Sequence, residues 1–143
     1  MNRIPWSELE IDEDYRERHM DKPFTGVAFE VDANGRVIAE AEFVDGVLHG
    51  RKTTWYASGQ VESDGLYRNN VTHGERREWS ETGRLRKWVS AENGIPLEEK
   101  EWDETGALSG YFVLSETDPL WNIVRRSRER TQPGEAGTEN EGR

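Results

Sequence analysis

The sequence predicts an all-β fold, a single-sheet antiparallel β-meander built of 24-residue hairpin repeats with a C-terminal capping helix. Three observations predict it. Turn residues recur with one period, the residues between the turns alternate in character, and the 14 glycines suit a turn-rich chain. A meander of about seven to nine strands accommodates this periodicity.

The period is carried by three series of turn residues. Three series with the same period would rarely coincide by chance in 143 residues. Each series keeps the 24-residue spacing, and only the last step of the first series is one residue shorter: Gly35, Gly59, Gly83 and Gly106; Gly46, Asn70 and Gly94; Gly26, Gly50 and Gly74. Each unit is therefore predicted to be two short strands with two tight turns, whose glycines allow a positive φ.

The segment 36–43 shows the strand alternation. Val37, Ala39, Ala41 and Phe43 are expected on one face, and the charged residues between them on the other. Trp55, Trp79 and Trp102 recur at one repeat position, which favours an aromatic core between stacked hairpins. An open aromatic groove for a partner is the alternative.

Composition excludes several functional classes. The net charge is -10 and the isoelectric point about 4.8, which argues against nucleic acid and membrane surfaces as partners and permits a basic protein. The chain has no cysteine, no apolar leader and no long apolar run, so we expect a cytoplasmic protein. Nucleophile, phosphate-loop, dinucleotide and metalloprotease motifs are absent, so we expect neither enzyme activity nor a cofactor.

The expected organisation has four parts. Residues 1–23 form an N-terminal capping segment, 24–114 the repeat domain, 115–131 a C-terminal helix and 132–143 a disordered tail. The segment 1–21 suits a strand followed by a short helix, with Trp6, Leu9, Ile11 and Tyr15 covering the first sheet edge. In the C-terminal helix, Asp118 is the expected N-cap, Pro119 the first helical residue, and Leu120, Ile123 and Val124 an apolar stripe that packs on the last strands.

His49 and His73 occupy the same repeat position. One repeat is two strands, so the two residues should lie about 9–10 Å apart, whereas two imidazoles on one zinc need nitrogens within about 4 Å. We therefore predict turn-packing residues and no metal site.

Polar-face residues are the candidate partner-binding site. Trp88 is predicted opposite Leu85 and Val89, at the repeat position of Glu40 and Asp64, either as a binding hot spot or packed under the C-terminal helix. Alternation places seven carboxylates in an acidic stripe, interpreted as a solvated face or as a docking surface for a basic partner. They are Glu30, Asp32, Glu40, Glu42, Glu62, Asp64 and Glu78.

The stretch GRKTTWYASGQVESDGLYRNNVTHG, from Gly50 to Gly74, resembles the bacterial variant of the MORN repeat. The resemblance extends over about residues 24–109, with three good copies and one degenerate copy. It departs at Val31-Asp32, where an aromatic pair belongs, and in GIPLEE, which has no closing glycine. Short bacterial members are commonly antitoxin or immunity proteins. The resemblance therefore implies a protein that occludes the active site of a cognate toxin, with a non-catalytic scaffold for assembly or localisation as the alternative.

Overall fold

The computed structural model describes residues 2–130 in full and the backbone of the C-terminal helix as far as Glu141. The chain divides into two compact units, Met1–Phe112 and Val113–Arg143. The first contains the repeats and the second the helix α1 (Pro119–Glu141). The tail predicted at residues 132–143 lies outside the fully described residues.

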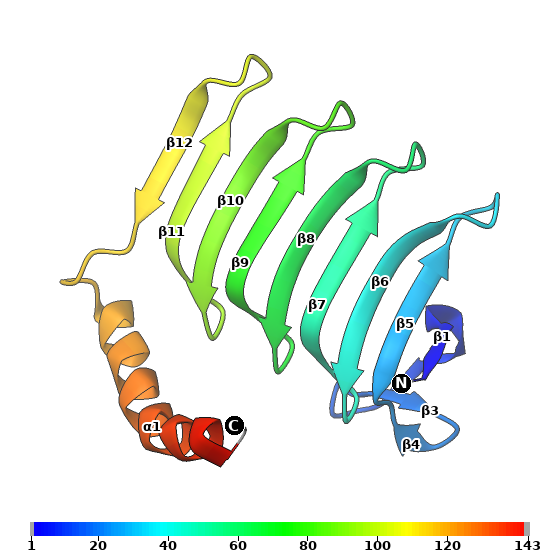
Figure 1. Cartoon of the computed structure of the whole chain (residues 1–143), viewed down its shortest axis with the longest axis horizontal. Coiled ribbons are helices and arrows are strands. Elements are labelled where there is room, and N and C mark those ends of the chain that lie inside the picture. Colours follow the sequence, from blue (N-terminus) through cyan, green and yellow to red (C-terminus); the bar gives the residue numbers. More distant parts are fainter. Residues whose placement is uncertain (1, 142–143) are drawn as a thin grey trace. The chain divides into compact units, whose positions relative to one another are not determined.

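The first unit is built on a nine-stranded sheet with the order β1-β5-β6-β7-β8-β9-β10-β11-β12 (Figure 1). From β5 onward, successive strands are neighbours, as a meander requires. The predicted all-β meander with one C-terminal helix is confirmed. The strands are β1 (Arg3–Pro5), β5 (Gly26–Val31), β6 (Val37–Val44), β7 (Val47–Trp55), β8 (Val61–Arg68), β9 (Val71–Trp79), β10 (Leu85–Glu92), β11 (Ile95–Trp102) and β12 (Leu108–Val113).

One kind of turn closes the odd-to-even strand pairs. In the first, the N–H of Asp32 donates to the carbonyl of Arg36 at 2.9 Å, and that of Gly35 donates to the carbonyl of Asp32 at 3.0 Å. Gly35 has φ +79°. The same two hydrogen bonds recur at residues 56–60, 80–84 and 103–107. This is a three-residue hairpin loop ending in a left-handed residue, the conformation for which glycine is suited.

A two-residue turn closes the other pairs and also links adjacent repeats. Asp45 and Gly46 both have positive φ, as a type I′ turn requires. The second residue of each such turn donates its N–H to a carbonyl of the preceding repeat. The three bonds, at 2.8–2.9 Å, are Gly46 to Phe24, Asn70 to Leu48 and Gly94 to Thr72. Donor and acceptor both advance by one full repeat each time, so the repeats stack through their turns as well as through their strands.

The His-Gly pairs lie where β7 and β9 bend beside their neighbours. Gly50 and Gly74 have φ +118° and +117°, a region that L side chains rarely adopt. The side chains of Glu42 and Leu66, which occupy equivalent positions in successive repeats, lie over these two glycines. The glycine at this repeat position therefore has two roles: it adopts a positive φ, and it leaves room for a neighbouring side chain.

The strand register defines two faces. The Trp88 face carries one continuous row of paired residues from β5 to β11: Phe29, Glu40, Thr53, Asp64, Arg77, Trp88 and Lys100. The Ala41 face carries the row Ala28, Ala41, Lys52, Gly65, Arg76, Val89 and Glu99, and beside it the row Glu30, Ala39, Thr54, Ser63, Glu78, Lys87 and Glu101.

The hydrophobic core of the first unit lies at its N-terminal end, on the Ala41 face. Ala39, Ala41 and Phe43 are buried there, which confirms the predicted alternation of β6. The ring of Trp6 meets that of Phe43 edge-on, with centroids 5.3 Å apart. Phe24 and Ala28 complete the buried cluster, against which Ile4, Leu9 and Leu48 also pack. The aromatics supply much of this core.

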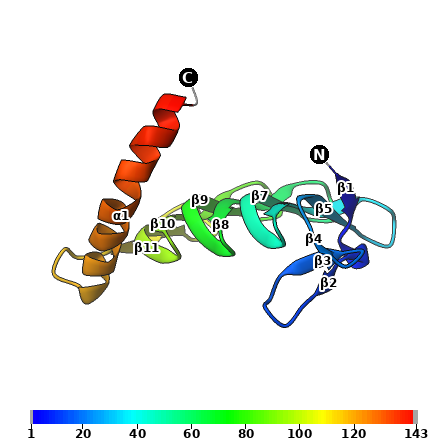
Figure 2. The same cartoon turned by 90° about the horizontal axis from the view of Figure 1, so that it is seen from below.

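The N-terminal segment differs from the prediction in two ways. Where one strand followed by a short helix was predicted, it holds several short strands, the 3₁₀ helix η1 (Trp6–Glu8) between the first two of them, and a second, three-stranded sheet. That sheet consists of β2 (Glu10–Ile11), β3 (Glu17–His19) and β4 (Lys22–Pro23), and it lies on one side of the first strands of the large sheet (Figure 2).

The first sheet edge is covered by β1, which pairs with β5 in parallel, so the sheet is mixed at this end. The covering residues are only partly those predicted. Trp6 and Leu9 pack on the core, whereas Ile11 and Tyr15 are exposed. Strong local turns explain the difference. Asp12 accepts the N–H groups of Asp14 and Arg16, so the chain reverses and leaves those two side chains in solvent.

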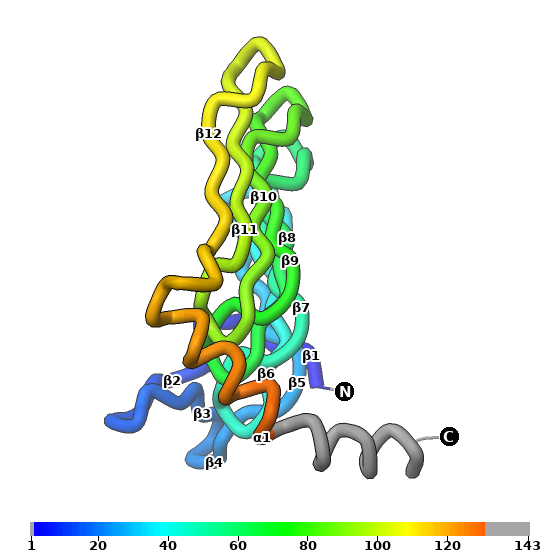
Figure 3. Tube along the Cα trace, turned by 90° about the vertical axis from the view of Figure 1, so that its left-hand side faces the viewer, coloured from blue at the N-terminus to red at the C-terminus, as the bar shows by residue number. Residues whose placement is uncertain are grey.

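The rest of the large sheet is a single layer of strands (Figure 3). Trp55, Trp79 and Trp102 end β7, β9 and β11 and are half-buried. The hydroxyl of Tyr56 donates to the carbonyl of Trp79 at 2.7 Å, so this hydrogen bond links one repeat to the next. The tryptophans therefore lie at the strand ends, beside the three-residue loops.

In the second unit, α1 begins at Pro119 as predicted. Oδ1 of Asp118 accepts the N–H of Leu120 at 2.9 Å, which confirms the N-cap. Of the predicted apolar stripe, Val124 is buried, whereas Leu120 and Ile123 are exposed. None of the helices in the described part of the chain is both long enough and apolar enough to cross a bilayer.

Candidate protein-binding face

The predicted acidic stripe is divided between the two faces. Glu40, Glu42 and Asp64 do share the Trp88 face with Trp88. Glu30 pairs with Ala39, and Glu78 pairs with Ser63 and Lys87, so both lie on the Ala41 face. Placing all seven carboxylates on one face was therefore wrong.

The physical reason is the numbering of paired residues. In the central pairs from β5 to β10, a residue of even number pairs with one of odd number, as in Glu40 with Thr53 and Arg77 with Trp88. Alternation holds within a strand, but the even-numbered face on one strand becomes the odd-numbered face on the next. A stripe drawn through even numbers alone therefore changes face at each turn from β5 to β10.

The remaining two carboxylates have local roles. Asp32 lies in the first three-residue loop, where its Oδ1 accepts the N–H groups of Asn34 and Arg36 at 2.8 and 3.1 Å. Glu62 lies beside the register shift of β8, and the hydroxyl of Thr54 donates to its Oε1 at 3.0 Å. Asp32 stabilises a turn, and Glu62 contacts a residue of the Ala41 face.

On the Trp88 face, two of the predicted carboxylates, Glu40 and Asp64, have cationic partners. Arg3 lies 3.1 Å from Glu40, and Arg51 lies 2.6 Å from Asp64, which also accepts the hydroxyl of Thr53 at 3.0 Å. The guanidinium of Arg3 also stacks 4.1 Å from the ring centroid of Phe29. This face therefore presents charges of both signs, and its surface is neither a bare acidic stripe nor apolar.

Trp88 is placed by its neighbours on both sides. Its indole N–H donates to Oε1 of Glu75 on β9 at 2.8 Å, and Arg77 donates to the same oxygen at 2.9 Å. The ammonium of Lys100 on β11 lies 5.5 Å from the Trp88 ring and 6.0 Å from that of Tyr111. Trp88 thus lies on the face of β10 opposite to that of Val89, as predicted, with its indole oriented along the sheet.

Two pKa shifts report on this cluster. The hydrogen bond from Trp88, followed by the charge of Arg77, lowers the pKa of Glu75 below its ordinary value because both favour the carboxylate. The pKa of Tyr111 is raised, mainly because its hydroxyl donates to Glu98 at 3.0 Å. Glu75, Arg77, Lys100 and Tyr111 were not among the predicted site residues. The feature that identifies them is the strand register, because each lies on a strand next to that of Trp88 or Lys100.

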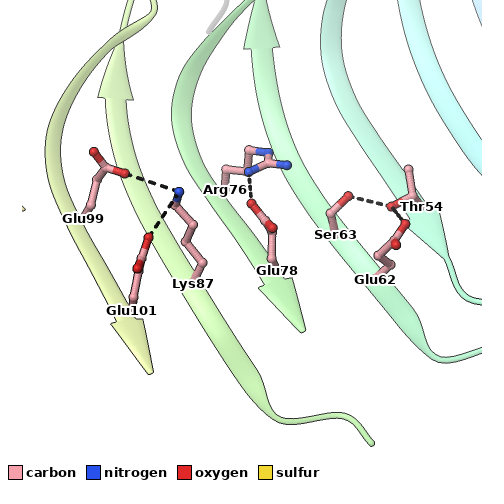
Figure 4. Close-up of polar contacts among 8 residues, drawn as sticks. All are labelled: Thr54, Glu62, Ser63, Arg76, Glu78, Lys87, Glu99 and Glu101. Carbon is pink, nitrogen blue, oxygen red and sulfur yellow. Dashed lines mark hydrogen bonds and ion pairs between the residues drawn. The ribbon is translucent and has the colours of Figure 1, made fainter. Parts of the chain in front are cut away.

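The Ala41 face has a polar network of its own beyond the N-terminal core (Figure 4). The hydroxyls of Thr54 and Ser63 are 2.6 Å apart, and Arg76 forms an ion pair with Glu78. Lys87 lies 3.7 Å from Glu99 and 3.5 Å from Glu101. These contacts are made within the sheet, so the charged groups of this network contact one another.

The two histidines lie on alternate strands, His49 on β7 and His73 on β9. Nδ1 of His73 accepts the N–H of Asn93 at 3.0 Å, whereas His49 is exposed. Within residues 2–130 no group of three or more histidine, aspartate or glutamate side chains is arranged to hold a metal ion.

Comparison with known proteins gives one family match. Residues 48–69 match the MORN repeat variant. The MORN match runs from β7 through β8 to the turn before β9, which is one structural repeat. This repeat variant suggests a repeat scaffold for protein interaction or localisation. No curated protein matches the sequence.

Among solved structures, a crystal structure of TarM is 15% identical with a TM-score of 0.39. Accessory secretory protein 1, 2 and 3 of Streptococcus pneumoniae is 17% identical with a TM-score of 0.26. In both cases the match covers 76% of this chain and only 20% of the other. The chain thus spans a fifth of the length of these proteins.

Proposed function

We propose that this protein is a non-catalytic binding protein that captures a partner protein on the Trp88 face. The observation that carries the proposal is the orientation of Trp88 within a continuous row across seven strands. Tryptophan concentrates binding energy when a partner excludes water from around it. An indole already held by Glu75 and Lys100 loses little conformational freedom on binding, which favours affinity.

The surroundings of Trp88 suit a protein partner. Arg77, Lys100 and Tyr111 are residue types enriched at protein interfaces or able to donate to a partner's polar groups. Each is half-buried or exposed and lies on the same side of the sheet. Along the row the acidic Glu40 and Asp64 come before the basic Arg77 and Lys100. This uneven distribution favours a partner with complementary charges in register, because a displaced partner would bring like charges together.

In its more specific form, the proposal is that this protein is a cytoplasmic antitoxin or immunity protein that blocks the active site of a toxin. Two features support it. The sequence Gly50–Gly74 is similar to bacterial MORN variants that commonly belong to toxin–antitoxin modules, and the net charge of -10 suits a basic partner. The support from charge comes from the whole chain, since Glu40 and Asp64 on the Trp88 face are paired with arginines.

A non-catalytic scaffold for assembly or localisation is the second candidate, favoured by the MORN match itself. Expression of the neighbouring gene alone and together with this one separates the two. The antitoxin proposal expects growth arrest by the neighbour, rescue by this protein and co-purification of the two. A harmless neighbour that does not co-purify would refute the antitoxin function and leave the scaffold.

A variant comparison then tests the face. Trp88→Ala should abolish rescue, whereas Lys87→Ala, one residue along β10 on the opposite face, should retain it. Similarly, Asp64→Lys should weaken partner binding more than Glu78→Lys, because only Asp64 lies on the Trp88 face. If the two variants of each pair had equal effects, the Trp88 face would not be the binding surface.

A further inference from the structure

β12 is an edge strand without the usual protection. It is the last strand of the sheet, and among the strands in the described part of the chain it alone has no charged residue, with the sequence LSGYFV. Leu108, Tyr111 and Phe112 are 56%, 60% and 42% exposed. Natural edge strands carry charges, prolines or bulges because an open edge pairs readily with another strand.

The opposite edge of the same sheet shows that contrast. There the outermost strand is β1, which is three residues long, carries Arg3 and ends at Pro5. A charged residue and a proline in so short a strand discourage pairing with another chain. Within the sheet, one edge strand is thus protected and the other has none of these devices.

Gly110, in the middle of β12, has no requirement within the chain. Its φ lies outside the left-handed region, and the three atoms nearest to a Cβ built there belong to the Glu101 side chain, at 3.5–3.9 Å, which is ordinary contact. A hollow of about 230 Å³ is lined by Glu99, Glu101, Gly110, Tyr111 and Phe112. A glycine inside a strand marks a place where another group approaches closely.

We propose that β12 pairs antiparallel with β12 of a second copy of this chain, about a two-fold axis that passes beside Tyr111. Residues opposite each other then share a face, so Tyr111 meets its own copy and Phe112 lies opposite Gly110. Each Phe112 ring fills the hollow over the other copy's Gly110, the arrangement by which an aromatic residue compensates an edge glycine. The two nine-stranded sheets join into one continuous sheet.

A second copy fits this edge because the strand is complementary to itself. The same strand supplies both the glycine of the hollow and the aromatic side chain that fills it. A chain with a net charge of -10 repels its copy, but β12 adds no charge at the contact. Glu99 and Glu101, which border the hollow, share the ammonium of Lys87, which offsets part of their charge. The pairing is isologous, so it closes at a dimer.

Cross-linking tests the register. The chain has no cysteine, so Tyr111→Cys introduces a single thiol. Two Cα atoms directly opposite in an antiparallel pair lie about 4.5–5.5 Å apart, within the range of a disulfide. We expect mild oxidation of Tyr111→Cys to give a covalent dimer and Val44→Cys, an exposed site on β6, to stay monomeric. Equal cross-linking of the two variants would overturn the proposal.

Light scattering after size exclusion tests the association itself. We expect the full chain to dimerise as its concentration rises. Phe112→Lys should abolish dimerisation, whereas Val44→Lys, at an apolar residue of nearly equal exposure (41%), should not. Circular dichroism of both variants checks that the sheet is intact, so that their oligomeric states can be compared. A wild-type chain that is monomeric at every concentration, or that forms open polymers, would overturn the two-fold pairing.

Discussion

His73 and Asn93 are joined by a hydrogen bond in which the Asn93 N–H donates to the imidazole Nδ1 at 3.0 Å. Two repeats earlier the N–H of Asp45 donates to the hydroxyl of Thr25 at 2.9 Å. Thr25 and His73 occupy the same repeat position, two periods apart. This position therefore supplies an acceptor for the first N–H of the next two-residue turn, a structural role for the histidine.

Removing that acceptor should destabilise the protein. We expect His73→Ala to lower the free energy of unfolding by about 1 kcal/mol, the usual net value of one hydrogen bond. His49→Ala, at the same repeat position but exposed, should change it by less than about 0.5 kcal/mol. Urea unfolding followed by tryptophan fluorescence measures both. Equal losses would contradict the role assigned to His73.

The glycine of the second His-Gly pair should tolerate no side chain. Gly74→Ala places a Cβ at φ +117° and 3.2 Å from the side chain of Leu66, so we expect a loss of about 1–2 kcal/mol. Gly110→Ala is the control, because that residue has an ordinary φ and meets only ordinary contacts. Thermal and urea unfolding of both variants, below the concentration at which any dimer forms, would reveal the difference. A loss at Gly110 as large as at Gly74 would refute this explanation of the repeated glycine.

The hydrogen bond between Trp88 and Glu75 can be detected without a partner. Because that bond is the main cause of the lowered pKa of Glu75, Trp88→Phe should raise this pKa towards its ordinary value. An NMR titration of the Glu75 side-chain carboxyl measures the change. The Lys87→Ala variant, altered on the other face of β10, should leave the titration where it is. An unchanged pKa in Trp88→Phe would mean that the indole does not hold Glu75.

Acid should weaken the fold through two turn aspartates. The pKa of Asp103 is lowered chiefly by the hydroxyl of Thr105, and that of Asp12 by the N–H of Arg16. A carboxyl whose folded pKa is depressed contributes stability above its unfolded pKa and loses it as pH falls through the folded value. We therefore expect the urea midpoint to fall on acidification below the ordinary aspartate range. Asp103→Asn should flatten that dependence, and an unaltered curve would contradict the assignment.

Periodicity and local turn chemistry were sufficient to predict the repeat architecture. The regular spacing of Gly46, Asn70 and Gly94 predicts the turns because a positive φ restricts the residue types that fit. Burial of Ala39, Ala41 and Phe43 follows from alternation within one strand. Asp118 caps α1 as expected because capping depends on neighbouring residues alone.

The parts that could not be predicted depend on contacts between strands. Glu30 and Glu78 were assigned to the wrong face because the pairing of odd with even residues is fixed by turn geometry. The parallel pairing of β1 with β5 involves a segment outside the repeats, so the periodicity does not predict it. Likewise, Glu75 and Lys100 become neighbours of Trp88 only through the register of β9 and β11.

The most direct test of the binding account is isothermal titration calorimetry of the partner that co-purifies with this protein. Trp88→Ala, Lys87→Ala and the wild type should be compared under one salt condition. Truncation of a central aromatic residue typically costs about 2 kcal/mol or more, so Trp88→Ala should weaken the partner's affinity by about thirtyfold or more. Lys87→Ala should leave it within about threefold of wild type. A partner that binds Trp88→Ala as tightly as wild type would contradict the claim that this face is the binding site.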